Sequence, residues 1–111
     1  MITSNSFVRG KFDTARETAF GSITSSFTKV GTSFESPFSI FYVQNFTNQL
    51  MDFSISFEGL TTTFTLAANG IICGDMISNQ VQISVGESIW VKARGSLPAS
   101  GFVQFSAVTP I

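Results

Sequence analysis

The sequence predicts an all-β fold: a single-domain antiparallel β-sandwich or jelly roll of about eight strands, with an extended N-terminal arm. From position 51 to 58, large apolar residues alternate with polar ones in the run MDFSISFE. A period of two is typical of a strand with one buried and one solvated face. Turn signals rich in Gly, Asn and Ser recur at the spacing of roughly 8–12 residues expected for such folds. No segment shows a comparable helical repeat. A chain of 111 residues is the size of one domain.

We divide the chain into an N-terminal arm, residues 1–19, and a sandwich domain, residues 20–111. The predicted strands are 23–30, 38–45, 50–57, 62–67, 71–76, 81–85, 88–93 and 102–108. The almost continuously apolar segment 38–45 indicates a central strand covered on both faces. Asn69-Gly70 is a typical signal for a tight hairpin, so it should join strand 62–67 to strand 71–76. Gly74 inside a strand indicates a bulge or a close backbone approach.

The predicted core consists of apolar residues that share one face of these strands. They are Phe53, Ile55, Phe57, Phe64, Leu66, Ile89, Val91, Val103 and Phe105. The polar residues that alternate with them, such as Asp52, are expected on a solvated face. Cys73 follows two isoleucines, and we expect a buried, inert thiol there.

The first 19 residues are polar, mixed in charge and without a clear period. We predict that this arm contacts a neighbouring copy, because its large apolar side chains would be costly to leave in water. Its basic residues would then face the acidic span between Val30 and Val91 of that copy, which has no Lys or Arg. The predicted contact residues are Phe7, Val8, Arg9, Lys11, Phe12 and Arg16. Two plainer readings stay open: a partly disordered terminus and an ordinary solvated surface.

The residue inventory predicts no enzyme, no catalytic residue, no metal and no cofactor. The chain has no His and a single Cys, which excludes the usual His-dependent nucleophilic sites and thiolate zinc clusters. Asp52 and Glu58 lie six positions apart, a spacing that any solvated strand face shows. No calcium loop surrounds Glu58, Asp75 or Asn79.

Charge and hydropathy limit the classes of partner and the cellular location that we expect. No basic patch of the kind that nucleic-acid binding needs is present. No apolar run approaches the ~20 residues of a membrane span, and no signal peptide is visible. We therefore expect a chain made in the cytoplasm and not secreted, with no nucleic-acid or membrane partner. Trp90 and Tyr42 are candidates for a sugar-binding platform, although both lie in predicted strands, where core packing is the more common use.

A series of strand-and-turn motifs follows in a characteristic order. Val43-Gln44-Asn45-Phe46-Thr47-Asn48 ends a strand in an Asn–Thr turn, and Ile55-Ser56-Phe57-Glu58-Gly59 is a strand with its turn. Leu66-Ala67-Ala68-Asn69-Gly70 leads to Asp75-Met76-Ile77-Ser78-Asn79, and Gly86-Glu87-Ser88-Ile89-Trp90-Val91-Lys92 closes the series before a Ser/Pro/Gly loop and a last strand. In this order, from about Phe20 to Val108, the chain resembles small β-sandwich proteins encoded among the virion genes of tailed bacteriophages. Glu87 and Trp90 depart from the Thr and Tyr of that pattern.

The resemblance implies a non-enzymatic structural protein of a tailed-bacteriophage virion. It implies a capsid-decorating, cement or head accessory protein that assembles through β-edges and its arm. The implied partners are other copies of the chain and virion proteins such as the major capsid protein or neck and tail proteins, and the implied location is the virion. Three alternatives remain: a neck or tail component, a carbohydrate- or receptor-binding module of the tail, and an accessory domain of an enzyme that uses Asp52 or Glu58.

Overall fold

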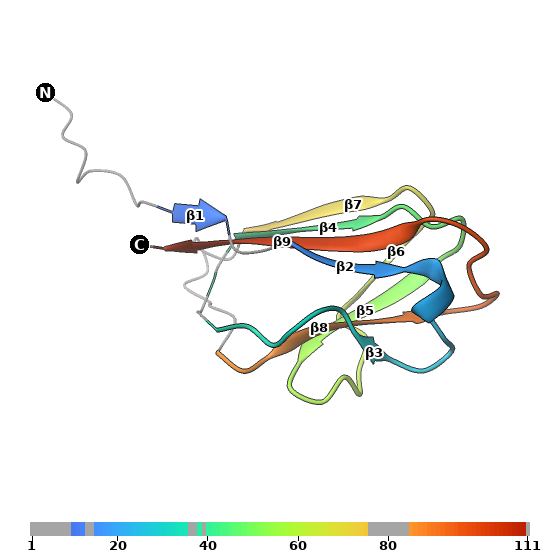
Figure 1. The fold of residues 1–111 in the computed structure, drawn as a ribbon, viewed down its shortest axis with the longest axis horizontal. Coiled ribbons are helices and arrows are strands. Elements are labelled where there is room, and N and C mark those ends of the chain that lie inside the picture. Colours follow the sequence, from blue (N-terminus) through green and yellow to red (C-terminus); the bar gives the residue numbers. More distant parts are fainter. Residues whose placement is uncertain (1–9, 13–14, 36–37, 39, 76–84, 111) are drawn as a thin grey trace, which may run out of the picture.

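The computed structural model describes residues 10–12, 15–35, 38, 40–75 and 85–110, which form two antiparallel sheets packed face to face (Figure 1). The five-stranded sheet contains β1 (Gly10–Phe12), β2 (Arg16–Ala19), β4 (Ile40–Asn45), β7 (Ile71–Asp75) and β9 (Phe102–Pro110). The four-stranded sheet contains β3 (Thr28–Lys29), β5 (Met51–Ser56), β6 (Phe64–Leu66) and β8 (Ser88–Ala93). A short 3₁₀ turn, η2 (Phe20–Ser22), follows β2. The predicted all-β sandwich is confirmed.

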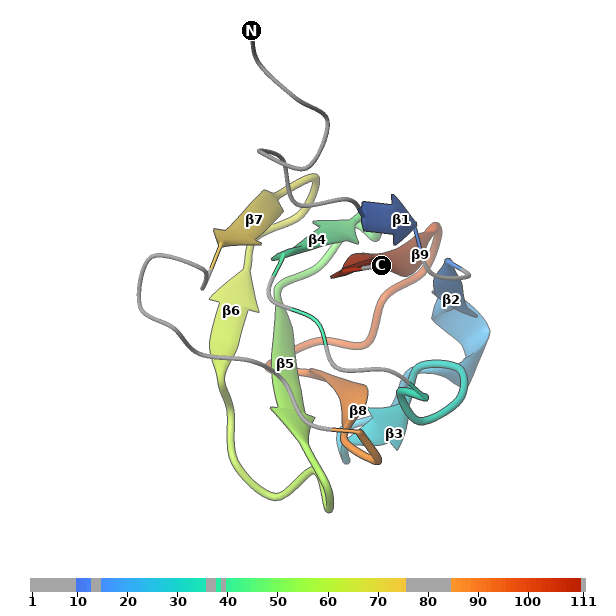
Figure 2. The same cartoon turned by 90° about the vertical axis from the view of Figure 1, so that its left-hand side faces the viewer.

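The strand order is that of a jelly roll. β1 and β2 pair with successive parts of β9, while β4 pairs with residues 103–108 of the same strand. Because β4 occupies one edge of β9, β1 and β2 share the other and act as one interrupted strand. The sheets then read β1/β2–β9–β4–β7 and β3–β8–β5–β6. With β1 and β2 counted as one strand, every connection except β5–β6 crosses between the sheets, as in the two Greek keys of a jelly roll. Figure 2 shows the two layers end-on.

The core lies between the sheets and is built around aromatic rings. Phe34 and Phe38, from the β3–β4 connection, pack edge to face with ring centroids 4.6 Å apart. Both also contact Phe105 of β9, at 5.3 and 5.7 Å. Such pairs contribute about 0.5–1.5 kcal/mol beyond the area they bury. Large core side chains therefore come from a connection as well as from strands.

Most of the predicted core is confirmed. Six of the nine residues are buried: Phe53, Leu66, Ile89, Val91, Val103 and Phe105. Ile55 and Phe64 are partly buried and pack against this core. Phe57 is the exception, because β5 ends at Ser56 and the side chain of Phe57 is 61% exposed.

The predicted hairpin between strands 62–67 and 71–76 is wrong. Asn69 does adopt a left-handed conformation (φ 63°), and the amide of Gly70 donates to the carbonyl of Ala67 at 2.9 Å. The turn is therefore present, but β6 pairs with β5 and β7 pairs with β4. The chain uses this turn to pass from one sheet to the other.

Two further expectations concern β7. Gly74 pairs in continuous register, so there is no bulge, and a Cβ there would overlap the ring of Phe41 on β4, so a side chain and not another backbone approaches it closely. The expectation of a buried Cys73 is wrong: the register places it opposite the partly exposed Tyr42, and its side chain is exposed. Residues 81–84 of the predicted strand 81–85 lie outside the described residues, and Val85 belongs to a turn.

Candidate assembly surfaces

The structure describes only some of the N-terminal residues that were predicted to contact a neighbouring copy. Phe7, Val8 and Arg9 lie outside the described residues. The backbone of β1, which includes Lys11 and Phe12, pairs with residues 108–110 of β9 in the same chain. The segment 10–12 is therefore the start of the five-stranded sheet, which the lack of a period in this part of the sequence did not reveal.

Arg16 does not project toward a neighbouring copy, so that part of the prediction is wrong. It begins β2 opposite Phe105, an inward-facing core residue, and its side chain is therefore directed into the sandwich. Its Nε donates to the carbonyl of Thr32 at 2.9 Å, and its guanidinium carbon lies 4.8 Å from the ring centroid of Phe34. Arg16 is 7% exposed, and it closes the β2–β3 side of its own core.

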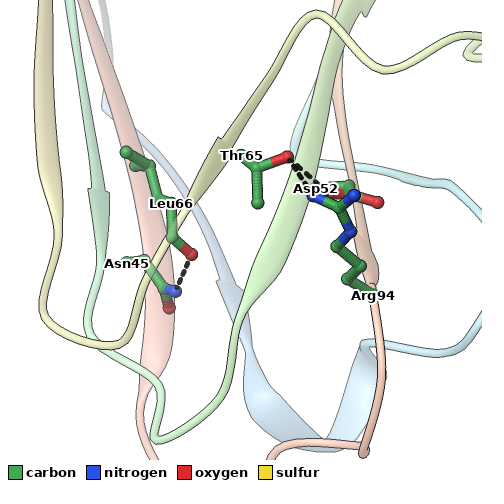
Figure 3. A network of polar contacts seen from close by, with 5 residues as sticks. All are labelled: Asn45, Asp52, Thr65, Leu66 and Arg94. Carbon is green, nitrogen blue, oxygen red and sulfur yellow. Dashed lines mark hydrogen bonds and ion pairs between the residues drawn. The ribbon is translucent and has the colours of Figure 1, made fainter.

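A buried amide clamps the corner where both sheets meet. Asn45, the last residue of β4, has no solvent exposure. Its Nδ2 donates to the carbonyls of Gln49, Leu66 and Ala67 at 2.9, 3.1 and 3.1 Å, and Figure 3 shows the bond to Leu66. Its Oδ1 accepts from the amide and the hydroxyl of Thr47 at 3.0 and 2.6 Å. One side chain therefore fixes both the β4–β5 and the β6–β7 crossings.

A second cluster of polar side chains, Asp52, Thr65 and Arg94, lies on the outer face of the four-stranded sheet (Figure 3). The Thr65 hydroxyl donates to Oδ1 of Asp52 at 2.7 Å, and the Arg94 guanidinium lies 4.0 Å from the same oxygen. Asp52 is only 5% exposed, so the expectation of a solvated side chain is wrong. The side chain of Arg94 is 59% exposed. Asp52 is held in place by Thr65 and Arg94, and Glu58 lies beyond the end of β5, on an exposed turn.

Trp90 does not offer an open platform. Its Nε1 donates to the carbonyl of Ser56 at 3.1 Å. A Cβ on Gly59 would overlap the indole, so the backbone of this turn lies against the ring. The Nζ of Lys29 is 5.4 Å from the ring centroid. These groups lie against the half-buried indole and reduce the aromatic surface on which a sugar could stack.

The connections β2–β3, β4–β5 and β8–β9 lie at the end of the sandwich opposite β1 (Figure 1), and they expose large apolar side chains. These are Phe20, Phe46, Leu50 and Leu97. Backbone bonds tie the connections together: Phe20 donates to Gly101 at 3.0 Å and Phe46 to Phe102 at 2.8 Å. Gly101 has φ +86°, and a Cβ there would overlap the carbonyl oxygen of Phe46. We call this end of the sandwich, with Phe20, Phe46, Leu50 and Leu97, the apolar end; it is formed by closely packed loops.

The outer faces of the two sheets differ in charge. Outward positions of the four-stranded sheet include Lys29, Asp52 and Lys92. On the five-stranded sheet, the outward residues are those that alternate with the buried residues of β4 and β9, together with the residues opposite them on the neighbouring strands. We give the name low-charge face to nine of these outward residues: Ile40, Tyr42, Gln44, Ile71, Cys73, Phe102, Gln104, Ser106 and Val108. None of these nine residues is Asp, Glu, Lys or Arg, and the acidic outward positions, Asp75 opposite Ile40 and Glu17 opposite Gln104, lie on the outer strands β7 and β2.

No metal site and no membrane-spanning helix is found among the described residues, and no similar protein is found. Among the described residues, no group of three or more His, Cys, Asp or Glu side chains is placed to hold a metal ion. Within the same residues, no helix is long and apolar enough to span a bilayer. Comparison with known proteins found no matching family model, no matching curated protein and no matching solved structure.

Proposed function

We propose that this chain is a non-enzymatic structural protein of a tailed-bacteriophage virion, of the class that decorates or cements the capsid or serves as a head accessory. The observation that supports it most directly is the low-charge face. Protein interfaces are depleted in Lys, Glu and Asp relative to the rest of the surface and enriched in aromatic residues. Nine neighbouring outward residues without Asp, Glu, Lys or Arg, with acidic residues only on the outer strands β7 and β2, favour repeated contact with other protein surfaces.

The fold and the apolar end are consistent with this role. Double-sheet jelly rolls occur in viral capsid domains, although the same architecture also serves lectins and cupins. Exposed large apolar side chains on connections that are bonded together offer an ordered contact surface, and clustered apolar exposure is typical of protein–protein sites. A glycan-binding module of the tail gains no such support, because the indole of Trp90 is covered by Gly59.

The test is the composition of the particle. Virions are purified from the source of this chain by two orthogonal separations, and the chain is counted per particle by quantitative mass spectrometry. We expect a fixed copy number that is a multiple of the local particle symmetry, together with ordered density for a two-layered sandwich in an electron cryomicroscopy map. An abundant cytoplasmic protein of the host serves as the contamination control. A chain that stays in the lysate and follows this control would refute the proposal.

The low-charge face allows a sharper version of the same experiment. Tyr42→Lys places a charge in the middle of that face, at a half-exposed position. Gly95→Lys places the same charge in the β8–β9 loop, where added atoms meet nothing within 4 Å. We expect Tyr42→Lys to reduce incorporation at least about tenfold, because an unpaired charge buried in an interface costs more than 1.4 kcal/mol. Equal incorporation of both variants would show that this face does not contact the particle.

A further inference from the structure

Among the described strands, three of the four sheet edges are protected against pairing with another strand, and the β7 edge is not. β3 has two residues and β6 has three, and short edge strands resist pairing. The β1/β2 edge is interrupted between Phe12 and Arg16 and carries charges. β7 is five residues long and pairs with β4 in continuous register without a bulge. It contains no Lys or Pro, and Ile71 is 61% exposed.

The direction of the β7 backbone groups follows from the neighbouring ladder. The amide of Asn45 donates to the carbonyl of Gly70 on the β7 side, and the amide of Phe46 donates to Phe102 on the β9 side. Antiparallel pairs alternate between hydrogen-bonded and non-hydrogen-bonded positions. Ile72 and Gly74 therefore direct their N–H and C=O groups toward β4. Ile71, Cys73 and Asp75 direct theirs toward the outer edge, where no described strand pairs with them.

We propose that two copies of this chain associate through β7, antiparallel to itself across a two-fold axis at Cys73. A two-fold axis perpendicular to the sheet keeps the outer faces of the two copies on the same side. Paired residues must then point to the same face, so the axis passes through a residue and not between two residues. The inner residues of β7 through which it can pass are 72, 73 and 74. Centring on Cys73 brings all three outward residues of each copy into hydrogen-bonded pairs and makes about six backbone bonds, against about four for either neighbour. The two low-charge faces then become one continuous surface.

Charge selects the same register. With the axis at Cys73, Asp75 lies opposite Ile71 of the other copy. The two Asp75 positions are then about 13 Å apart along the strands, beyond the Debye length of roughly 8–10 Å at physiological salt. With the axis at Gly74 the same positions would be only about 7 Å apart. The edge is thus complementary to itself, which is what a second copy requires.

This inference deepens the proposed function by naming the edge through which copies meet. The Cα atoms of a hydrogen-bonded antiparallel pair are about 5.5 Å apart, within the roughly 4.4–6.8 Å that a disulfide bridges. The native chain, with its single Cys, is followed by sedimentation over a roughly hundredfold concentration range and oxidised with copper–phenanthroline. We expect a reversible dimer and a covalent dimer joined at Cys73. A chain that remains monomeric, or a dimer that does not cross-link at Cys73, would overturn the proposal.

Two lysine variants test the register without depending on oxidation. Cys73→Lys places two ammonium groups directly opposite each other and should raise the dimer Kd at least about tenfold. Ile71→Lys faces Asp75 of the other copy and should leave the Kd within about threefold or lower it. Thermal melting of each monomer controls for folding. Equal effects of the two variants would contradict the two-fold register.

The two proposals can fail separately. The copy number in purified particles tests the structural role, whatever the dimer does in solution. If the chain is present in particles but neither dimerises nor cross-links at Cys73, the β7 pairing is wrong and the structural role stands. If the dimer forms and cross-links while the chain is absent from particles, the pairing is right and the proposed function is wrong.

Discussion

Replacing Asn45 tests whether a single buried amide holds the two sheets in place. The Asn45→Ala variant removes donors from three backbone carbonyls and an acceptor from Thr47. A typical neutral hydrogen bond contributes about 0.5–1.5 kcal/mol net, and a buried group left without a partner costs about 1–3 kcal/mol. The two hydrogens of Nδ2 serve three carbonyls, so two of the three bonds share one hydrogen. We expect a loss of about 3–5 kcal/mol in the free energy of unfolding.

The measurement is equilibrium unfolding in urea, followed by the fluorescence of the single Trp and by circular dichroism. Asn48→Ala is the matched control, since Asn48 accepts one exposed bond from the amide of Ala99 at 2.9 Å. The control should lose less than about 1 kcal/mol. A loss for Asn45→Ala as small as that of the control would refute the clamp.

The isosteric variant Asn45→Asp adds a pH signature. Its carboxylate would face three carbonyl oxygens without solvent, and burial together with this repulsion would raise its pKa in the folded state above the unfolded value of about 3.9. The folded state then binds more protons than the unfolded state. The deficit relative to the native chain is therefore smallest below about pH 4 and grows as the pH rises through the raised pKa. Asn45→Ala should show a deficit that does not depend on pH in this way.

Three further substitutions, two of them with a matched control variant, test the packing described above. Phe53→Ala should cost about 3–5 kcal/mol because the ring is buried, whereas Phe57→Ala, at an exposed position, should cost under about 1 kcal/mol; equal costs in urea unfolding would invalidate the burial assignment. Gly101→Ala should destabilise by more than about 2 kcal/mol through its positive φ and overlap, against less than about 0.5 kcal/mol for Gly95→Ala in thermal melting. Arg94→Ala should change stability by less than about 1 kcal/mol, since this partner of a 4.0 Å ion pair is exposed; a larger loss would mean that the pair is screened less than its exposure implies.

The sequence predicts buried positions well wherever the period of two continues within a strand. Phe53 is buried because its neighbours along β5 continue the pleat. Phe57 obeys the same spacing but lies beyond Ser56, where the strand ends and the chain turns toward Gly59 at φ +66°. Apolar spacing does not mark the end of a strand, because the end depends on where the partner strand stops pairing.

Pairing between distant segments is what the sequence does not show. The local turn at Asn69-Gly70 was predictable from residue type, yet the choice between a hairpin and a crossing depends on whether β7 pairs with β6 or with β4. Arg16 raises the same difficulty, since a charged residue in an irregular segment suggests a surface arm until its register with Phe105 is known. The clamp at Asn45 left a partial signal: the Asn-x-Thr spacing matches a side chain that accepts from the amide two residues on.

The clamp and the β7 edge are connected through one residue. Asn45 donates its side-chain amide to the end of β6 and its backbone amide to Gly70, immediately before β7 begins. The position at which β7 leaves the turn is therefore set by the same residue that joins the sheets. The backbone bond fixes which β7 residues direct their polar groups outward, and hence which positions can meet a second copy. A change at the corner should consequently weaken both folding and self-association, whereas a charge at Cys73 should weaken self-association alone.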